Sequence, residues 1–194
     1  NRIGIGEGEA NGSNFNGMDR RCCLFRSISD RCGMDGFWKT ITHLGDAGWF
    51  WIILGIVLLI PKKTRKAGIA ALAALAIGAL ITNVALKNII ARIRPYEVVE
   101  GLKFLIEPQS DFSFPSGHTC ASIGAALAMY PFLERKWGIP LVILAVLISL
   151  SRLYVGVHYP TDVLGGAVVG AFAAWGAVRI VKHGLVRKAK KAEK

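Results

Sequence analysis

The sequence predicts an all-α integral membrane protein, a helical bundle of about five spanning helices with an N-terminal helix in the membrane interface. Of the 194 residues 53% are hydrophobic, and the mean hydropathy is +0.42. These values exclude a disordered chain and are rare for a soluble domain. The stretch from Ala67 to Leu86 carries no charge, and about 20 apolar residues suffice for a helix to cross the hydrocarbon layer.

Five spans are expected in order along the chain. The second, Ala67 to Leu86, has full spanning length, whereas the first is centred on Trp49 to Ile60 and must borrow residues from Ile41 onward. The remaining three are expected at about Thr119 to Leu133, Ile139 to Leu150 and Val163 to Val181. The third and fourth spans are short, so neighbouring residues must extend them or the bilayer must thin locally.

The segments outside the spans divide the chain into three parts. Residues 1–17, rich in Gly and Asn, are expected to form a flexible tail, residues 18–182 a single membrane domain, and residues 183–194 a basic cytoplasmic tail. From Asp19 to Trp38, apolar side chains share one helical face beside several arginines, which favours an interfacial helix. A surface loop with scattered apolar residues fits this segment equally well. The sequence assigns no role to the cysteines of this region, Cys22, Cys23 and Cys32.

The charge pattern predicts the orientation of the bundle. The net charge is 24 − 13 = +11, and no nucleic-acid motif accompanies it, so we expect no nucleic-acid partner. Basic residues crowd the connections Pro61 to Lys66 and Glu134 to Lys136, together with the C-terminal segment. The positive-inside rule places these in the cytoplasm. The connections from Lys87 to Ser116 and from Ser151 to Asp162 then face outward together, across the plasma membrane.

Two cations follow the second span. Lys87 and Arg94 are seven residues apart, just before Pro95, and on a helix this spacing puts them two turns apart on one face. Two cations placed in this way could hold one multiply charged anion. Basic residues that merely reach toward the interface from a helix end are a common alternative.

The next motif, Pro115-Ser116-Gly117-His118, precedes the third span. Pro and Gly favour a tight turn before a helix, whose unpaired N–H groups and dipole attract an anion. Ser116 adds a hydroxyl donor, and His118 can exchange a proton near neutral pH. Alone, such a motif is more often a plain N-terminal cap.

The third motif joins the fourth and fifth spans. His158 and Asp162 are four residues apart, so the carboxylate can fix the imidazole tautomer and leave the other ring nitrogen to attack. Arg152 can donate two parallel hydrogen bonds to a phosphate. A structural cap at the start of the fifth span is the alternative explanation of the His/Asp pair.

Together, the three motifs resemble the tripartite signature of the type 2 phosphatidic acid phosphatase family, which shares its site plan with vanadium haloperoxidases. The order Lys-(six residues)-Arg-Pro, Pro-Ser-Gly-His and Ser-Arg-(five residues)-His-(three residues)-Asp matches without departure, and the resemblance covers roughly residues 38–182. It implies that His158 is the nucleophile, Asp162 its orienting partner and His118 the acid for the leaving oxygen. The implied phosphate holders are Lys87, Arg94, Ser116, Gly117 (through its backbone N–H) and Arg152. Family members usually have six spanning helices, whereas five are visible here.

The expected activity is hydrolysis of a lipid phosphate or diphosphate through a phosphohistidine, with no metal and no other cofactor. Undecaprenyl diphosphate, phosphatidic acid and phosphatidylglycerol phosphate suit the sequence equally, and the expected partners are this lipid and the bilayer. A homodimer is possible, and the sequence does not indicate the oligomeric state. Two alternatives are a lipid phosphotransferase and a phosphate-binding transporter, although transport needs no oriented His/Asp pair.

Two further pairs of residues carry weaker signals. Gly166 and Gly170 form a GxxxG pattern in the fifth span, which we expect to seat another helix of the same chain rather than a second copy. His43 and Asp46 lie one turn apart, but no phosphate holders accompany them. We therefore expect this pair to be a polar anchor at the membrane surface.

Overall fold

The structure, a computed structural model, describes residues 34–98, 105–107 and 109–192, and all secondary structure within them is helical. The all-α prediction is thereby confirmed. The expected N-terminal tail lies outside the described residues, as do most of the expected interfacial helix and the three cysteines before residue 34.

Most of the helices follow one another with short connections, whereas α6 ends at Val98 and α7 begins at Gly117. Helix α2 (Asp35–His43) leads through a 3-10 turn (Asp46–Gly48) into α3 (Trp49–Leu59), and α4 (Arg65–Ala79) continues through a π-helical segment (Leu80–Leu86) into α5 (Lys87–Ile90). After the short α6 (Pro95–Val98) come α7 (Gly117–Met129) with a 3-10 turn (Tyr130–Phe132), α8 (Arg135–Tyr154) and α9 (Pro160–Ala192). The residues expected to form a basic tail thus continue α9 as far as Ala192.

Among the described residues, three helical segments are long and apolar enough to span a membrane: Arg65–Val98, α8 and the Pro160–Gly184 part of α9. They cover the second, fourth and fifth expected spans. The first expected span is a bent pair, in which α2 and the segment from Asp46 to Leu59 meet at 42°, and it makes a fourth candidate if both arms cross together. The bend arises where Ala47 and Gly48 adopt positive φ.

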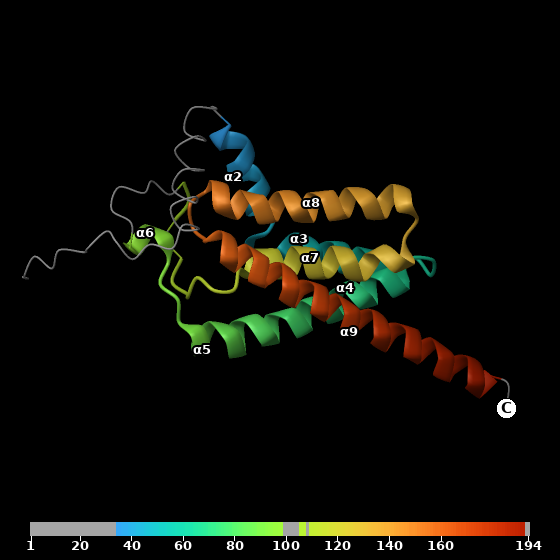
Figure 1. Ribbon diagram of the computed structural model, residues 1–194. Helices are drawn as coiled ribbons and strands as arrows, with labels where there is room; N and C mark the ends of the chain where they lie inside the picture. The colour runs from blue at the N-terminus through green and yellow to red at the C-terminus, as the bar shows by residue number, and fades with distance from the viewer. Residues whose placement is uncertain (1–33, 99–104, 108, 193–194) are drawn as a thin grey trace, which may run out of the picture.

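The third expected span, α7, differs from the others because it is the central helix. It contains 13 residues, and it packs against α4, α8 and α9 (Figure 1). Small residues such as Ala125, Ala126 and Ala128 are fully buried along it. Surrounding helices rather than lipid cover its backbone, so α7 does not need the length of a lipid-exposed span.

The functional motifs gather at one end of the bundle. Figure 1 shows the N-terminal ends of α7 and α9, the C-terminal end of α8, and both α5 and α6 at the same end. The connections from α3 to α4 and from α7 to α8 lie at the other end. The three motifs therefore lie at the same end of the bundle, as expected.

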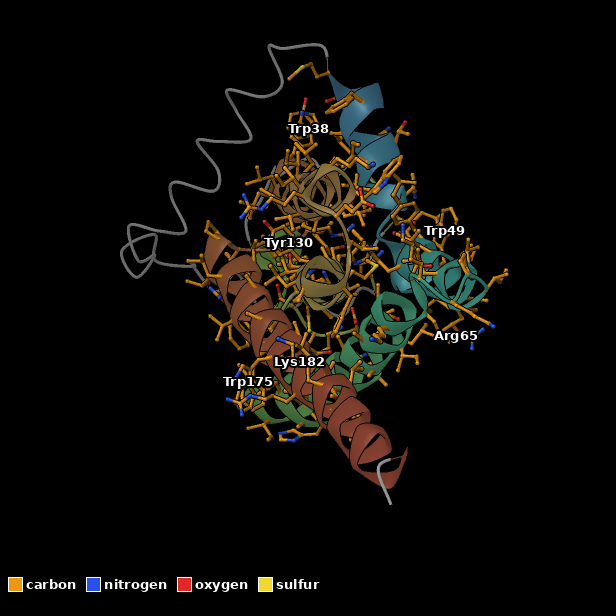
Figure 2. The ribbon with its side chains drawn as sticks, turned by 90° about the vertical axis from the view of Figure 1, so that its right-hand side faces the viewer. Trp38, Trp49, Arg65, Tyr130, Trp175 and Lys182 are labelled. Atoms are coloured by element: carbon orange, nitrogen blue, oxygen red, sulfur yellow. The ribbon has the colours of Figure 1, made fainter. Side chains whose placement is uncertain are left out.

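Large aromatic side chains lie on the periphery of the bundle. Figure 2, which views the bundle from the end opposite the motifs, places Trp49 and Trp175 on its outside, and these residues are 45% and 57% exposed. Trp51, by contrast, is buried and donates its indole N–H to Ser122 Oγ at 2.9 Å. Exposed aromatic residues of this kind suit a surface in contact with lipid.

Glycines allow α9 to approach α7 closely. A Cβ added at Gly166 would lie 2.5 Å from the carbonyl oxygen of Ser116, and one added at Gly170 would lie 2.7 Å from that of Cys120. The GxxxG pattern therefore seats a helix of the same chain, as predicted. This packing holds the start of α7 against α9, and Ser116 N–H donates to the Asp162 carbonyl at 3.0 Å.

We expect Gly170→Leu to destabilise the fold because its side chain would collide with the backbone of α7. Overpacking of this kind costs about 1–3 kcal/mol or more. Thermal unfolding in detergent measures the effect. Gly176→Ala in the same helix is the control, because a Cβ there would meet its nearest neighbour, Ile77, at 3.9 Å. Equal stability of the two variants would show that the contact between α7 and α9 is not tight.

Candidate active site

A cavity of about 500 Å³ lies at the end of the bundle where the motifs meet. Its polar side contains residues from all three motifs: Lys87, Arg94, Gly117, His118, Arg152 and His158. The opposite wall is apolar and comes from α3 and α4, with Ile52, Leu72, Leu75, Ala76 and Ala79. Ser116 and Asp162 are fully buried beside the cavity and do not line it. The cavity thus joins a cationic site to an apolar surface.

Lys87 and Arg94 meet in the cavity, but the helical geometry predicted for them is wrong. Helix α5 ends at Ile90, and Ala91 adopts a left-handed conformation with φ 45°. Residues 91–94 are not helical, and α6 begins at Pro95. Lys87 and Arg94 are nevertheless 8% and 2% exposed and contact the same carboxylate. A break in the helix therefore brings them together.

That carboxylate belongs to Asp111, which no motif in the sequence singles out. One of its oxygens binds the Lys87 ammonium and the other binds the Arg94 guanidinium. Partial burial raises the pKa of Asp111, but its hydrogen bonds and charge interactions with Lys87 and then Arg94 lower the pKa below its usual value. Asp111 is therefore charged at neutral pH. An anionic group already occupies the two cations that were predicted to hold a phosphate.

Ser116 serves as the N-cap of α7. Its hydroxyl oxygen accepts from Thr119 N–H at 3.4 Å and from the Thr119 hydroxyl at 3.1 Å. The Ser116 side chain therefore acts as a helix cap, which was the alternative to a phosphate-binding role. Gly117, one residue later, lines the cavity. The N-terminus of α7, with its partial positive charge, thus faces the cavity beside Lys87 and Arg152.

Arg152 is a fully buried cation at the end of α8. It donates to the Thr42 hydroxyl at 2.7 Å, and its Nε has no hydrogen-bond partner among the described residues. Burying a guanidinium with donors unused is costly. An anion in the cavity, which Arg152 lines, would satisfy the remaining donors.

His158 and Asp162 form the predicted pair at the start of α9. His158 Nδ1 lies 3.5 Å from Asp162 Oδ2. Hydrogen bonds between catalytic residues are often this long without substrate and shorten when the substrate binds. Its Nε2 lies 3.5 Å from the Arg94 guanidinium. Since Nδ1 faces the carboxylate and His158 lines the cavity, Nε2 is the ring nitrogen suited to attack.

The Asp162 carboxylate itself accepts hydrogen bonds from three donors, none of which was predicted from the sequence to belong to the site. Oδ1 accepts from Arg92 at 2.9 Å, while Oδ2 accepts from the Ser113 hydroxyl and from Tyr159 N–H. Arg92 and Ser113 come from the connection before α7, which is distant in sequence from α9. These contacts keep the carboxylate charged and fix its orientation toward His158.

His118 lies at the start of α7, and its partner corrects an expectation. Its Nε2 is 2.8 Å from Asp46 Oδ1, and the other oxygen of Asp46 is 2.7 Å from His43 Nδ1. Asp46 was expected to be part of a surface anchor with His43. The bend between α2 and α3 instead brings Asp46 into contact with His118, which lies 72 residues away in sequence.

A comparison with protein-family models now identifies this arrangement. The PAP2 superfamily model matches residues 67–184. The chain belongs to the PAP2 superfamily. It is therefore a lipid phosphatase, as the three motifs predicted. The match contains all residues of the three motifs together with Arg92, Asp111 and Ser113, and it does not include Thr42, His43, Asp46 or Ile52.

Relatives of this PAP2 chain share its sequence and its fold. An undecaprenyl-diphosphatase of Sulfolobus acidocaldarius is 37% identical over 142 residues, which are 72% of this chain and 68% of that protein. The transmembrane PAP2-type phosphatidylglycerolphosphate phosphatase of Bacillus subtilis superposes with a TM-score of 0.66 at 28% identity, covering 90% of this chain and 89% of that one. A bacterial vanadium-dependent iodoperoxidase shares the fold, with a TM-score of 0.71 at 18% identity over 90% of this chain and 51% of its own.

Proposed function

We propose that this PAP2 chain hydrolyses a lipid diphosphate or lipid phosphate at the outer face of the membrane, with His158 as the nucleophile. One observation carries the proposal: His158, backed by Asp162, lines the same cavity as three cations and a second histidine. The apolar wall from α3 and α4 supports a lipid substrate, because it can contact the start of an acyl or prenyl chain.

The first step transfers the phosphoryl group to the enzyme. Lys87, Arg94 and Arg152, with the Gly117 N–H, hold the phosphoryl oxygens and neutralise their charge. His158 Nε2 attacks phosphorus while the bond from phosphorus to the leaving oxygen breaks, and His118 gives that oxygen a proton. The products are a phosphohistidine at His158, neutral His118 and the departed lipid.

The second step regenerates the enzyme. A water molecule attacks the phosphohistidine, and His118 takes a proton from it. The bond between phosphorus and Nε2 breaks, its electron pair returns to His158, and inorganic phosphate leaves. Asp162 supports the positive charge that His158 carries while the P–N bond exists.

Among the possible substrates, we propose a polyprenyl diphosphate as the preferred one. Two undecaprenyl-diphosphatases are 37% and 39% identical to this chain over 142 and 140 residues, and the phosphatidylglycerophosphatase B of Bacillus subtilis is 35% identical over 143 residues, so sequence identity favours the diphosphate by a small margin. The cationic side of the cavity, with three basic side chains, also suits the larger charge of a diphosphate.

Phosphate release from a panel of purified lipids tests this function. The panel contains undecaprenyl diphosphate, phosphatidic acid and phosphatidylglycerol phosphate, each in one detergent and with EDTA present. We expect release from all three and the highest kcat/KM on the diphosphate. Release that requires an added alcohol acceptor would indicate a phosphotransferase. Absence of release from every lipid would overturn the proposal.

We also propose that α7, the third expected span, crosses the membrane while shielded by its neighbours, which brings the number of crossings to five. We propose further that the cavity faces outward. The basic connection around Lys63 lies at the end of the bundle away from the cavity, which supports this orientation under the positive-inside rule.

Labelling of single cysteines in intact cells tests the orientation. After the native cysteines are replaced, we expect an impermeant thiol reagent to label Glu107→Cys, an exposed position near the cavity, and not Lys63→Cys. Permeabilised cells should show labelling at both positions, which controls for accessibility. The reverse pattern in intact cells would place the active site in the cytoplasm.

Asp111 should compete with phosphate for Lys87 and Arg94. We expect Asp111→Asn to lower the inhibition constant of inorganic phosphate roughly threefold to tenfold, because it removes a competing charge worth about 1 kcal/mol at a partly exposed site. Inhibition of p-nitrophenyl phosphate hydrolysis measures this constant. Glu107→Gln, an exposed carboxylate in the same connection, should leave it unchanged. Weaker inhibition by phosphate in Asp111→Asn would show that Asp111 holds the two cations in place instead.

A further inference from the structure

We infer that Asp46 is a positioning residue for His118, so that the enzyme uses a second Asp/His pair for acid-base chemistry beside the nucleophilic pair. The inference rests on the proposed function, in which His118 protonates the leaving oxygen and later accepts a proton from water. It assigns a catalytic purpose to the bend between α2 and α3.

The contact between the two side chains has the geometry of a charge-assisted hydrogen bond. Asp46 Oδ1 lies 2.8 Å from His118 Nε2, and His43 Nδ1 binds the second carboxylate oxygen at 2.7 Å. The His118 side chain is 14% exposed, whereas the Asp46 side chain is 45% exposed. Asp46 therefore lies between the cavity and the surface and contacts the outer edge of the imidazole.

The backbone around Asp46 is shaped for this approach. Ala47 and Gly48 have φ values of 48° and 69°, which turn the chain sharply between the two helices. A Cβ on Gly45 would lie 2.8 Å from His118 Cδ2 and 2.7 Å from Ile148 Cγ2. Only a glycine lets the turn come this near to His118. The turn is thus built against the imidazole as well as against the core.

The chemistry of His118 explains what such a carboxylate does. When Asp46 accepts a hydrogen bond from Nε2–H, Nδ1 becomes the nitrogen that exchanges a proton with the substrate. Protonated His118 then donates from Nδ1 to the leaving oxygen. Neutral His118 keeps its proton on Nε2, which leaves the Nδ1 lone pair ready to accept a proton from water. One hydrogen bond thus selects the tautomer that both steps need.

The charges around His118 show why a carboxylate is needed there. Arg152 from α8 and Lys87 from α5 line the same cavity and oppose the protonated imidazole, and Asp46 from the 3-10 turn faces it from the other side with His43 beyond. Two nearby cations disfavour imidazolium, and an anion in hydrogen-bonding contact offsets this effect. Without Asp46, less of His118 would carry the proton that the leaving oxygen requires.

The test compares substrates that differ in their leaving groups. Asp46→Asn should lower kcat on phosphatidic acid, whose leaving alkoxide is strongly basic, by about 10- to 100-fold, a part of the full effect of a general acid. The burst of p-nitrophenol from p-nitrophenyl phosphate reports the first step alone, and its leaving group needs little protonation, so we expect the burst rate to fall less than about threefold. The alkaline limb of the kcat profile on phosphatidic acid should move to lower pH, because the imidazolium loses its counter-charge.

Two controls separate positioning from a structural role. Asp35→Asn removes a carboxylate of α2, which accepts from the Tyr154 hydroxyl at 2.9 Å, and should lower activity on both substrates by the same factor or not at all. In a His118→Ala background, Asp46→Asn should cause no further loss, because both changes remove the same function. Asp46→Glu should recover part of the selectivity for phosphatidic acid.

The outcomes distinguish this inference from the proposed function. Equal losses on both substrates with an unmoved pH profile, or additive losses in the double variant, would overturn the role of Asp46 while wild-type turnover and its dependence on His158 stand. If the wild-type protein released phosphate from no substrate, or if His158→Ala retained activity, the proposed function itself would fail.

Discussion

His158→Ala should abolish turnover of every substrate, with a loss of more than about 10⁴-fold in kcat, because no other group can form the covalent bond to phosphorus. Asp162→Asn should keep the shape of the pair and lose the orienting charge, leaving a small residual rate about 10²- to 10⁴-fold below that of the wild type. Phosphate release with undecaprenyl diphosphate and phosphatidic acid measures both.

Both variants need evidence that the fold is intact, since Asp162 also accepts hydrogen bonds from Arg92 and Ser113. Size-exclusion elution and thermal unfolding in detergent supply it. His183→Ala removes an exposed histidine in the part of α9 that lies far from the active site, and this variant should have wild-type activity. Near-normal activity of folded His158→Ala would exclude His158 as the nucleophile.

The second large effect concerns His118, whose importance should depend on the leaving group. A lipid alkoxide leaving from a monoester is a strong base, while the lipid phosphate leaving from a diphosphate departs largely unaided. Because general-acid help is worth about 10²- to 10⁴-fold, His118→Ala should approach that loss on phosphatidic acid and lose distinctly less on a diphosphate or an aryl phosphate. Rates at saturating substrate in one detergent avoid effects of lipid partitioning.

Equal losses of His118→Ala on all three substrates would contradict the role of leaving-group acid. His118 would then act mainly in holding phosphate or in the hydrolysis of the phosphohistidine. The same comparison gives the reference for Asp46, whose variant should shift selectivity in the same direction by a smaller factor.

Hydropathy predicted most of the fold because lipid imposes a length and a composition on exposed helices. The segment around Ala67 to Leu86 and the helices α8 and α9 meet that requirement. It does not apply to α7, which is shielded by its neighbours; the span expected there was short, and the 13-residue helix is short as well. The bend between α2 and α3 depends on backbone conformation at Ala47 and Gly48, which apolar periodicity does not encode.

The sequence predicted those site residues that act together and lie close together in the chain. His158 and Asp162 lie one turn apart, and Ser116 to His118 mark the start of a helix. Asp111 and Asp46 could not be found in this way, because their contacts join segments 17 to 72 residues apart. For Lys87 and Arg94 the spacing suggested the correct pair and the wrong geometry, since a turn at Ala91 brings them together.

Trapping of the covalent intermediate tests the central claim most directly. The enzyme is mixed with substrate labelled with ³²P in the terminal phosphoryl group, quenched in alkali within milliseconds, and digested for mass spectrometry. We predict label on the peptide that contains His158, stable in base and lost in acid, in the wild-type protein and not in His158→Ala. Phosphate released at the wild-type rate without any label on His158, or label on His118 in its place, would contradict the account.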